Sequence, residues 1–263
     1  MLSTYIAERG FVKNKEAEAL YTYEIASIYY QQGSEFSQEN KENQWKIKEA
    51  LELCTQTTTQ FPNSLGAEKC KTLSLQITKP QLQITTESFL RPNQTEKLLV
   101  SHKNTDVVDF KAYQLSKKQY DAFQKIYRED AKKTFIEQLK VNSSWTAKLT
   151  NEKDYQNHST EVLLPKFSNG LYLVVANTKE IWASATLQVS RIAMVESEDN
   201  DEKHLQFIDR AFGAPIVNAE VAITFSYQNK VIQTQKLKTD QHGRISFKKA
   251  AHNRSTFEVE VNH

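Results

Sequence analysis

The hydrophobic pattern of the chain changes its period near residue 82. Before that point apolar side chains recur at the three- and four-residue steps of a helix, and after it they alternate with polar side chains as in a strand. A segment with one period does not pack well in the other conformation, because the period decides which residues share a face. The sequence therefore predicts a mainly β protein that begins with an α-helical segment.

Three helices are expected in residues 1–80. The first carries an apolar stripe over residues 16–30 and is expected to end before Gly33, since glycine is common just past a helix end. Ser64 is placed to cap the third helix, and Pro80 stops it. The apolar residues expected to be buried on that third helix are Leu65, Ala67, Leu73, Leu75 and Ile77.

The helical segment resembles one tetratricopeptide-type hairpin. The matching parts are residues 29–33, Ala50 and the motif of residues 61–64. Helical repeats of this kind bury their faces only against neighbours. The segment is therefore expected either to lean on the following domain or to be the last unit of a longer stack.

The chain holds two cysteines, Cys54 and Cys70, both in the helical segment. One interpretation is a disulfide clamp between neighbouring helices, which requires an oxidising compartment. The other is a pair of small buried apolar side chains that never meet. Neither cysteine has the partners of a zinc site.

Residues 81–190 are expected to form an immunoglobulin-like sandwich, for which seven short strands are typical. The seven predicted strands are residues 82–85, 97–101, 110–115, 144–149, 160–164, 171–176 and 185–189. A helical insertion, residues 117–139, interrupts them. Its apolar residues at steps of four are Phe123, Tyr127, Ala131, Phe135 and Leu139. That stripe predicts a face that docks on the sandwich, with an exposed recognition helix as the alternative.

Residues 191–263 are expected to form a second β-sandwich, clipped at its far edge because only six strands are visible. These six are residues 192–195, 204–208, 221–225, 231–238, 243–247 and 257–261. Asp240 and Gly243 mark one turn: the carboxylate can bond the backbone ahead of it, and the glycine can take the positive φ that closes the bend.

Composition excludes several classes of function. Lysine plus arginine (34) nearly balances aspartate plus glutamate (32), so the formal charge is +2 and no basic surface for nucleic acid is expected. No run of 18 apolar residues is present to span a membrane, and residues 1–10 lack the apolar core of a signal peptide. Motifs for a nucleophile or a phosphate-binding loop are absent as well. We therefore expect no catalytic, cofactor-binding or metal-binding residues and no enzymatic activity.

Two sets of polar residues are candidate binding sites. The six histidines are scattered without metal-pair spacing: His102, His158, His204, His242, His252 and His263. An acidic run near His204 offers oxygen ligands for calcium, but it lacks the glycine of a known calcium loop, and a solvated interdomain loop is the simpler interpretation. The run comprises Glu196, Glu198, Asp199, Asp201 and Glu202.

The three tryptophans, Trp45, Trp145 and Trp182, suggest carbohydrate stacking on a sandwich face. Each lies in or beside a periodic element, so a core or half-buried role is the simpler interpretation. A stand-alone surface adhesion or carbohydrate-binding module nevertheless remains an alternative function for the chain.

Residues 82–261 resemble the tandem macroglobulin domains of bacterial alpha-2-macroglobulin-like proteins. The resemblance rests on residues 164–174 (LPKFSNGLYLV), then 185–195, 209–221 and 239–247 in that order. It implies the non-catalytic scaffold part of a large cell-envelope protein, located outside the cytoplasm, that entraps or inhibits proteases. Its partners would be the other domains of the same chain and, through the parent protein, proteases. Neither cysteine stands in the thioester motif that many members of the family carry, so no reactive residue is carried over.

Overall fold

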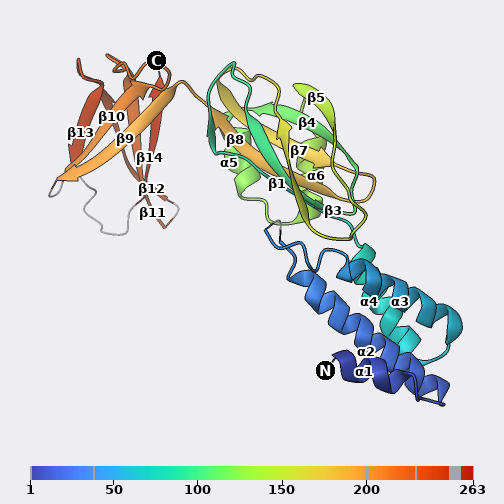
Figure 1. Cartoon of the computed structure of the whole chain (residues 1–263). Helices are drawn as coiled ribbons and strands as arrows, with labels where there is room; N and C mark the ends of the chain where they lie inside the picture. The colour runs from blue at the N-terminus through green and yellow to red at the C-terminus, as the bar shows by residue number, and fades with distance from the viewer. Residues whose placement is uncertain (1, 38, 200–201, 229, 249–255, 263) are drawn as a thin grey trace. The chain divides into compact units, whose positions relative to one another are not determined.

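The structure is a computed structural model that describes residues 2–37, 39–199, 202–228, 230–248 and 256–262 (Figure 1). As the change of period predicts, a helical segment is followed by β-sheets. The chain divides into two compact units. The first comprises Met1–Ser88, Thr95–Pro165 and Leu171–Leu187, and the second comprises Phe89–Gln94, Lys166–Gly170 and Gln188–His263.

The helical segment contains one helix more than the sequence predicts among its described residues. The helices are α1 (Leu2–Arg9), α2 (Lys15–Ser34), α3 (Lys46–Gln60) and α4 (Leu65–Thr78). The Asn14 side chain caps α2, and the Ser64 hydroxyl caps α4 by accepting a hydrogen bond from the Ala67 N–H at 3.1 Å, as predicted. The additional helix, α1, has only eight residues, and its sequence has no apolar stripe from which the helix could be predicted.

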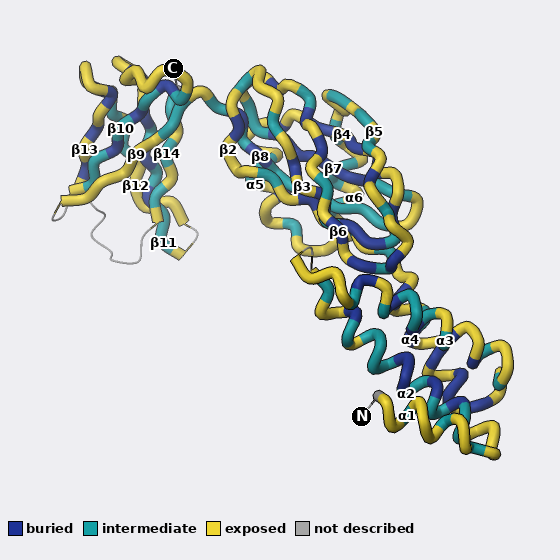
Figure 2. Tube along the Cα trace, viewed as in Figure 1, coloured by how far each residue is buried: buried dark blue, intermediate teal, exposed yellow. Residues whose placement is uncertain are grey.

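The three longer helices share one apolar core, visible as the buried inner stripes in Figure 2. Its fully buried members are Ala26, Ile47, Ala50, Cys54, Cys70, Leu73 and Ile77. Gly66 lets α4 approach α2, because a Cβ at this position would lie 2.3 Å from the Ala19 carbonyl carbon. Gly33 was expected past the end of the first helix, but it lies within α2, where a Cβ would lie 2.5 Å from the Ile47 Cγ1. It is therefore a close-contact glycine and not a helix stop.

Two residues expected in the core of α4 are exposed. Leu65 is 50% exposed and Leu75 is 72% exposed, whereas Ala67, Leu73 and Ile77 are buried as predicted. Leu75 lies two positions from both Leu73 and Ile77, which places it on the opposite side of the helix.

The first sandwich combines a three-stranded sheet, ordered β1-β3-β6, with a five-stranded sheet, ordered β2-β8-β7-β4-β5. The strands are β1 (Gln81–Thr85), β2 (Phe89–Leu90), β3 (Lys97–Lys103), β4 (Val107–Leu115), β5 (Ser143–Lys148), β6 (His158–Leu163), β7 (Gly170–Asn177) and β8 (Trp182–Val189). All seven predicted strands are confirmed. The two-residue strand β2, which pairs in parallel with the end of β8, was not predicted because two residues carry no period.

The five-stranded sheet is buried on both faces at β4 and β7. On β4, Val108, Phe110 and Ala112 are buried on one face, while Tyr113 and Leu115 are buried on the other. The second face is the one covered by the insertion between β4 and β5.

The insertion consists of two short helices, α5 (Lys117–Gln124) and α6 (Glu129–Glu137), so its apolar stripe does not run along one continuous helix. Phe123, Phe135 and Leu139 pack on the sheet, which confirms the docking interpretation for these positions. Tyr127, 90% exposed, and Ala131 were expected on the same face and are not there. The break at residues 125–128 resets the helical phase, so a step of four across it no longer joins residues of one face.

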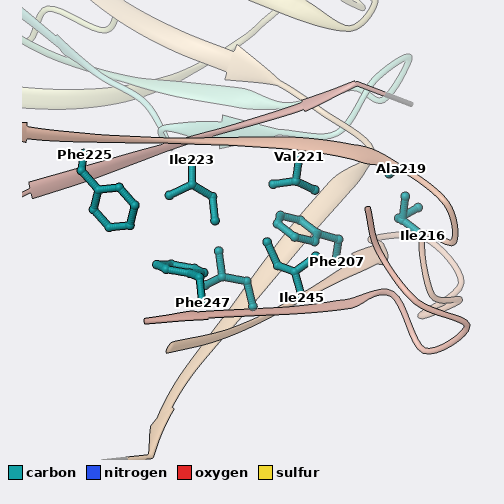
Figure 3. Packing of buried hydrophobic residues seen from close by; sticks show 9 residues of the cluster. Phe207, Ile216, Ala219, Val221, Ile223, Phe225, Ile245 and Phe247 are labelled. Atoms are coloured by element: carbon teal, nitrogen blue, oxygen red, sulfur yellow. The ribbon is translucent and has the colours of Figure 1, made fainter. Parts of the chain in front are cut away.

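The second unit carries two three-stranded sheets, ordered β13-β10-β9 and β12-β11-β14. The strands are β9 (Ile192–Asp199), β10 (Glu202–Asp209), β11 (Glu220–Tyr227), β12 (Lys230–Lys238), β13 (Arg244–Lys248) and β14 (Thr256–Asn262), which confirms all six predicted strands. Figure 3 shows the core between them. Phe225 of β11 meets Phe247 of β13 edge-on, with ring centroids 5.8 Å apart, so aromatic side chains from both sheets fill it.

Candidate functional site: the polar joint between the helices and the first sandwich

Buried polar side chains gather where the helical segment meets the first sandwich. We call Gln44, Asp154, Gln156 and His158 the polar joint. Gln44 lies just before α3, Asp154 and Gln156 lie in the loop between β5 and β6, and His158 begins β6. All four belong to the first compact unit. A buried polar group is costly unless it is hydrogen-bonded, so each contact here bears on how firmly the helices are held.

The loop before β6 takes an unusual backbone path that aims Asp154 inward. Lys153 and Tyr155 both have φ near +60°, the left-handed region that side chains other than glycine seldom adopt. The N–H of Lys153 donates to Asn151 Oδ1 at 3.0 Å, and the N–H of Gln156 donates to Asp154 Oδ1 at 3.0 Å. These two local hydrogen bonds stabilise the path and orient the carboxylate.

Gln156 joins this loop to both ends of the connection between α2 and α3. Its Nε2 donates to the carbonyl of Gly33, in the last turn of α2, and to the carbonyl of Gln44, just before α3, each at 3.0 Å. Gln44 in turn donates through its own Nε2 to Asp154 Oδ2 at 3.0 Å and to Glu152. The connection between two helices is thereby bonded to a loop more than 100 residues later in the chain.

Asp154 is the acceptor at the centre of the joint, with 1% of its side chain exposed. Its Oδ1 accepts from His158 Nε2 at 2.9 Å. Burial by itself raises the pKa of Asp154, but the hydrogen bonds from His158, the Gln156 N–H and Gln44 outweigh it and leave the pKa below its usual value. Asp154 is therefore an ionised, fully hydrogen-bonded carboxylate at neutral pH.

His102 of β3 lies beside the joint, with its ring centroid 6.1 Å from that of His158. Its Nε2 is 3.1 Å from the Thr160 hydroxyl on β6. Burial and, next, the neighbouring charge of His158 lower the pKa of His102, while the Thr105 backbone and Asp106 oppose the shift. His102 therefore favours the neutral form in the folded chain.

A second attachment holds the end of α4. Asn104, in the turn between β3 and β4, donates through Nδ2 to the Ile77 carbonyl at 2.9 Å, and Lys103 Nζ is 3.4 Å from the Gln76 carbonyl. The last carbonyls of a helix lack partners within the helix, so these two side chains supply them. Burial lowers the pKa of Lys103. Because the helices are attached at two places, the arrangement is suited to holding a fixed geometry.

Most sequence candidates lie away from this joint. Of the four histidines that the structure describes, only His102 and His158 come together, while His204 Nδ1 lies 2.7 Å from the Ser246 hydroxyl. His252 and His263 lie outside the described residues. In the part of the chain that the structure describes, no three His, Cys, Asp or Glu side chains are grouped to hold a metal ion.

The acidic run is not an interdomain loop, as the simpler interpretation held. Glu196 and Glu198 lie on β9, within the second unit, where both pair with Lys203 of β10. Asp201 lies outside the described residues. Glu196 and Glu198 are therefore part of a β-hairpin, where one lysine pairs with both carboxylates.

The tryptophans do not form a stacking surface. Trp145 lies flat on Phe110, with centroids 5.1 Å apart and planes 9° apart, and Trp182 lines a cavity of about 390 Å³ beneath α6. Trp45 was expected to be half-buried, but it is 45% exposed, with Lys48 over its ring at 5.3 Å.

The two cysteines are free thiols in the structure, and both are buried in the same apolar cluster of the helical segment. Asp240 confirms the predicted turn, since its Oδ1 accepts from the N–H groups of His242 and Arg244, each at 2.8 Å, while Gly243 has φ +71°. These backbone hydrogen bonds, that of Arg244 first, lower the pKa of Asp240.

Sequence reasoning missed the joint itself. Gln44, Asp154 and Gln156 lie in polar stretches that read as solvated loops, and only the close spacing of Asp154 and His158 offered a signal. Which polar loop is buried depends on what packs over it, and the local pattern carries no such information.

The comparison with solved structures bears on the fold. No known family profile matches the sequence, and no curated protein matches it. Among solved structures, the chain is similar to native alpha-2-macroglobulin from Escherichia coli spanning domains MG0-NIE-MG1, with 16% identity and a TM-score of 0.51 over 68% of this chain. It is also similar to the shorter piece spanning domains NIE-MG1, with 14% identity and a TM-score of 0.50 over 70% of this chain and 97% of that one.

The match spans 64% of the length of the longer of these two structures. No described helix has both the length and the apolar character needed to cross a bilayer. At these identities the likeness concerns the fold. In its fold, this chain has a structural match to the N-terminal domains of bacterial alpha-2-macroglobulin over about 70% of its length.

Proposed function

We propose that this chain is a non-catalytic scaffold portion of a large envelope protein that entraps or inhibits proteases. The observation that carries the proposal is the match to the two-domain piece of Escherichia coli alpha-2-macroglobulin, 97% of which is covered. A match to one sandwich domain alone would be weak support for this function, because unrelated surface proteins use that fold. Two domains that match in one alignment are a more specific likeness.

The proposed domain division follows the sequence. Residues 1–80 form a tetratricopeptide-like helical unit, residues 81–190 form a macroglobulin sandwich with the insertion 117–139, and residues 191–263 belong to a second sandwich. The proposed location, outside the cytoplasm in the cell envelope, is that of the resembled family.

The polar joint supports a scaffold role. A flexible linker would leave the helices free to move, whereas Gln156, Gln44 and Asp154 bond the helix connection to the first sandwich through buried contacts. A protease trap has to position distant parts of a long chain, and a rigid joint transmits position where a loose one does not. In this proposal, the helices and the first sandwich move as one body.

The test uses the natural full-length protein that contains this sequence. It is incubated with several proteases, and activity is then measured on a small peptide substrate and on a large protein substrate. Entrapment predicts that the protease keeps activity on the peptide and loses it on the protein, and that the cleaved parent migrates faster on a native gel. The isolated 263-residue chain is expected to protect nothing.

Two results would overturn the proposal. One is a natural protein without further sandwich domains, and the other is a full-length protein that leaves the activity on large substrates unchanged for every protease. A glycan array probed with the chain tests the adhesion alternative, for which binding that is lost in Trp182→Ala would be required.

A further inference from the structure

Cys54 and Cys70 face each other across two packed helices. They are the only cysteines among 263 residues. Cys54 lies on α3 and Cys70 on α4, and these helices are consecutive and separated by the short turn that Ser64 closes. Both side chains belong to the same apolar cluster, and each is 0% exposed.

The two thiols are close enough for each to shift the pKa of the other. Each thiol also has a hydroxyl neighbour on the opposite helix: Ser74 lies by Cys54, and Thr57 lies by Cys70. Because residues three or four apart share one helix face, these four side chains lie on the facing surfaces of α3 and α4.

We propose that Cys54 and Cys70 form a disulfide that clamps α3 to α4 when the chain meets an oxidising compartment. Two S–H bonds break and one S–S bond forms. A disulfide oxidant, such as oxidised glutathione, accepts the two electrons and two protons and leaves as two thiols. The inference does not depend on protease trapping, because any oxidising location suffices.

The two thiols have shifted and unequal pKa values in the folded chain. The neighbouring Cys54 thiol, and after it Thr57, outweigh burial and lower the pKa of Cys70. The neighbouring Cys70 thiol, together with burial, raises the pKa of Cys54.

Burial decides when the bond forms. At 0% exposure neither sulfur meets an oxidant in the folded chain. The disulfide is therefore expected to form during folding, before the helices close, and to resist reduction afterwards. The oxidation of folded, reduced protein should then be limited by opening of the helices and accelerate in mild urea.

The clamp closes a short loop. For a loop of about 15 residues, a disulfide contributes on the order of 3 kcal/mol, which corresponds to a change of about 100-fold in the unfolding equilibrium constant. The added resistance to unfolding should be confined to the helical segment, since both cysteines lie there.

The experiment refolds the full 263-residue chain in a glutathione buffer and counts free thiols under denaturing conditions. The expected result is a monomer without free thiols, about 2 Da lighter than the reduced chain. Its helices should resist urea more, with an unfolding constant about 100-fold smaller than after reduction.

The matched controls are Cys54→Ser and Cys70→Ser, which keep one thiol, and the double variant Cys54→Ala/Cys70→Ala. All three should unfold alike with and without reductant. Free thiols that persist at equilibrium in the oxidising buffer would overturn the proposal, as would disulfide formation only between chains. An oxidised monomer no more stable than the reduced one would also overturn the clamp. If a variant fails to fold, the comparison of oxidised and reduced wild type decides alone.

Discussion

Replacing Gln156 by alanine tests how much the polar joint holds the helices on the first sandwich. The change removes the two hydrogen bonds at 3.0 Å that Nε2 donates to the carbonyls of Gly33 and Gln44. The Gly33 carbonyl keeps a partner, because it also accepts from the N–H of Phe36 at 3.1 Å. The stability that is lost is therefore expected to come mostly from the Gln44 carbonyl, whose own side chain is buried.

The magnitude follows from these two contacts. A hydrogen bond contributes about 1 kcal/mol net, and a buried group left without a partner costs about 1–3 kcal/mol. The variant should thus lose about 3 kcal/mol in the free energy of unfolding of the first unit. For a unit of this size, that lowers the melting temperature by about 6–12 °C.

Two measurements check the result. Thermal unfolding followed by circular dichroism gives the midpoint, and hydrogen exchange read by mass spectrometry gives the protection of residues 33–45. In Gln156→Ala, protection should fall first in that segment and in the loop before β6. The second unit, which contains neither partner, should exchange as before.

The matched control is Gln31→Ala, which removes an exposed glutamine from α2 and should stay within about 0.5 kcal/mol of the wild type. The reasoning fails if Gln156→Ala has the same melting temperature as Gln31→Ala and if residues 33–45 are equally protected from hydrogen exchange in the two variants. Such a result would mean that apolar packing alone seats the helices.

Three further predictions concern other parts of the chain. Because the folded-state pKa of His102 is lowered, stability should be lost as pH falls below about 6.5, and His102→Gln should flatten that loss in urea titrations at several pH values. Gly66→Ala should destabilise the helices by more than about 2 kcal/mol because its Cβ meets backbone at 2.3 Å, whereas Gly10→Ala, with 3.5 Å available, should be near neutral in thermal melts. Phe207→Ala should cost about 3–5 kcal/mol in the second unit, and Phe212→Ala, at an 82% exposed site, almost nothing by the same urea assay.

The sequence predicted the architecture well because periodicity reports which face is buried. All thirteen expected strands are present, and so is the expected turn at Asp240 and Gly243. The errors lie where a local pattern has two readings. The sequence predicts that Gly33 ends a helix, yet this glycine contacts Ile47, which only the packing of α3 reveals. Tyr127 reads as part of a stripe that a break at residues 125–128 interrupts.

The polar joint could not be predicted for a different reason. Its members lie in the α2–α3 connection and in the loop before β6, and a polar side chain looks the same in sequence whether water or a buried carbonyl is its partner. Residues 153 and 155 hold φ values near +60° without being glycine, so even the unusual backbone of this loop leaves no mark in the sequence.

The joint also sets the order in which the chain can mature. Gln156 lies 112 residues after the Gln44 carbonyl that it bonds. At a synthesis rate of about 5–20 residues per second, that glutamine leaves the ribosome roughly 6–22 s after its partner. Throughout that interval the helices exist without the side chains that later fix them. The helices therefore cannot be fixed to the first sandwich through Gln156 until the loop before β6 has been synthesised.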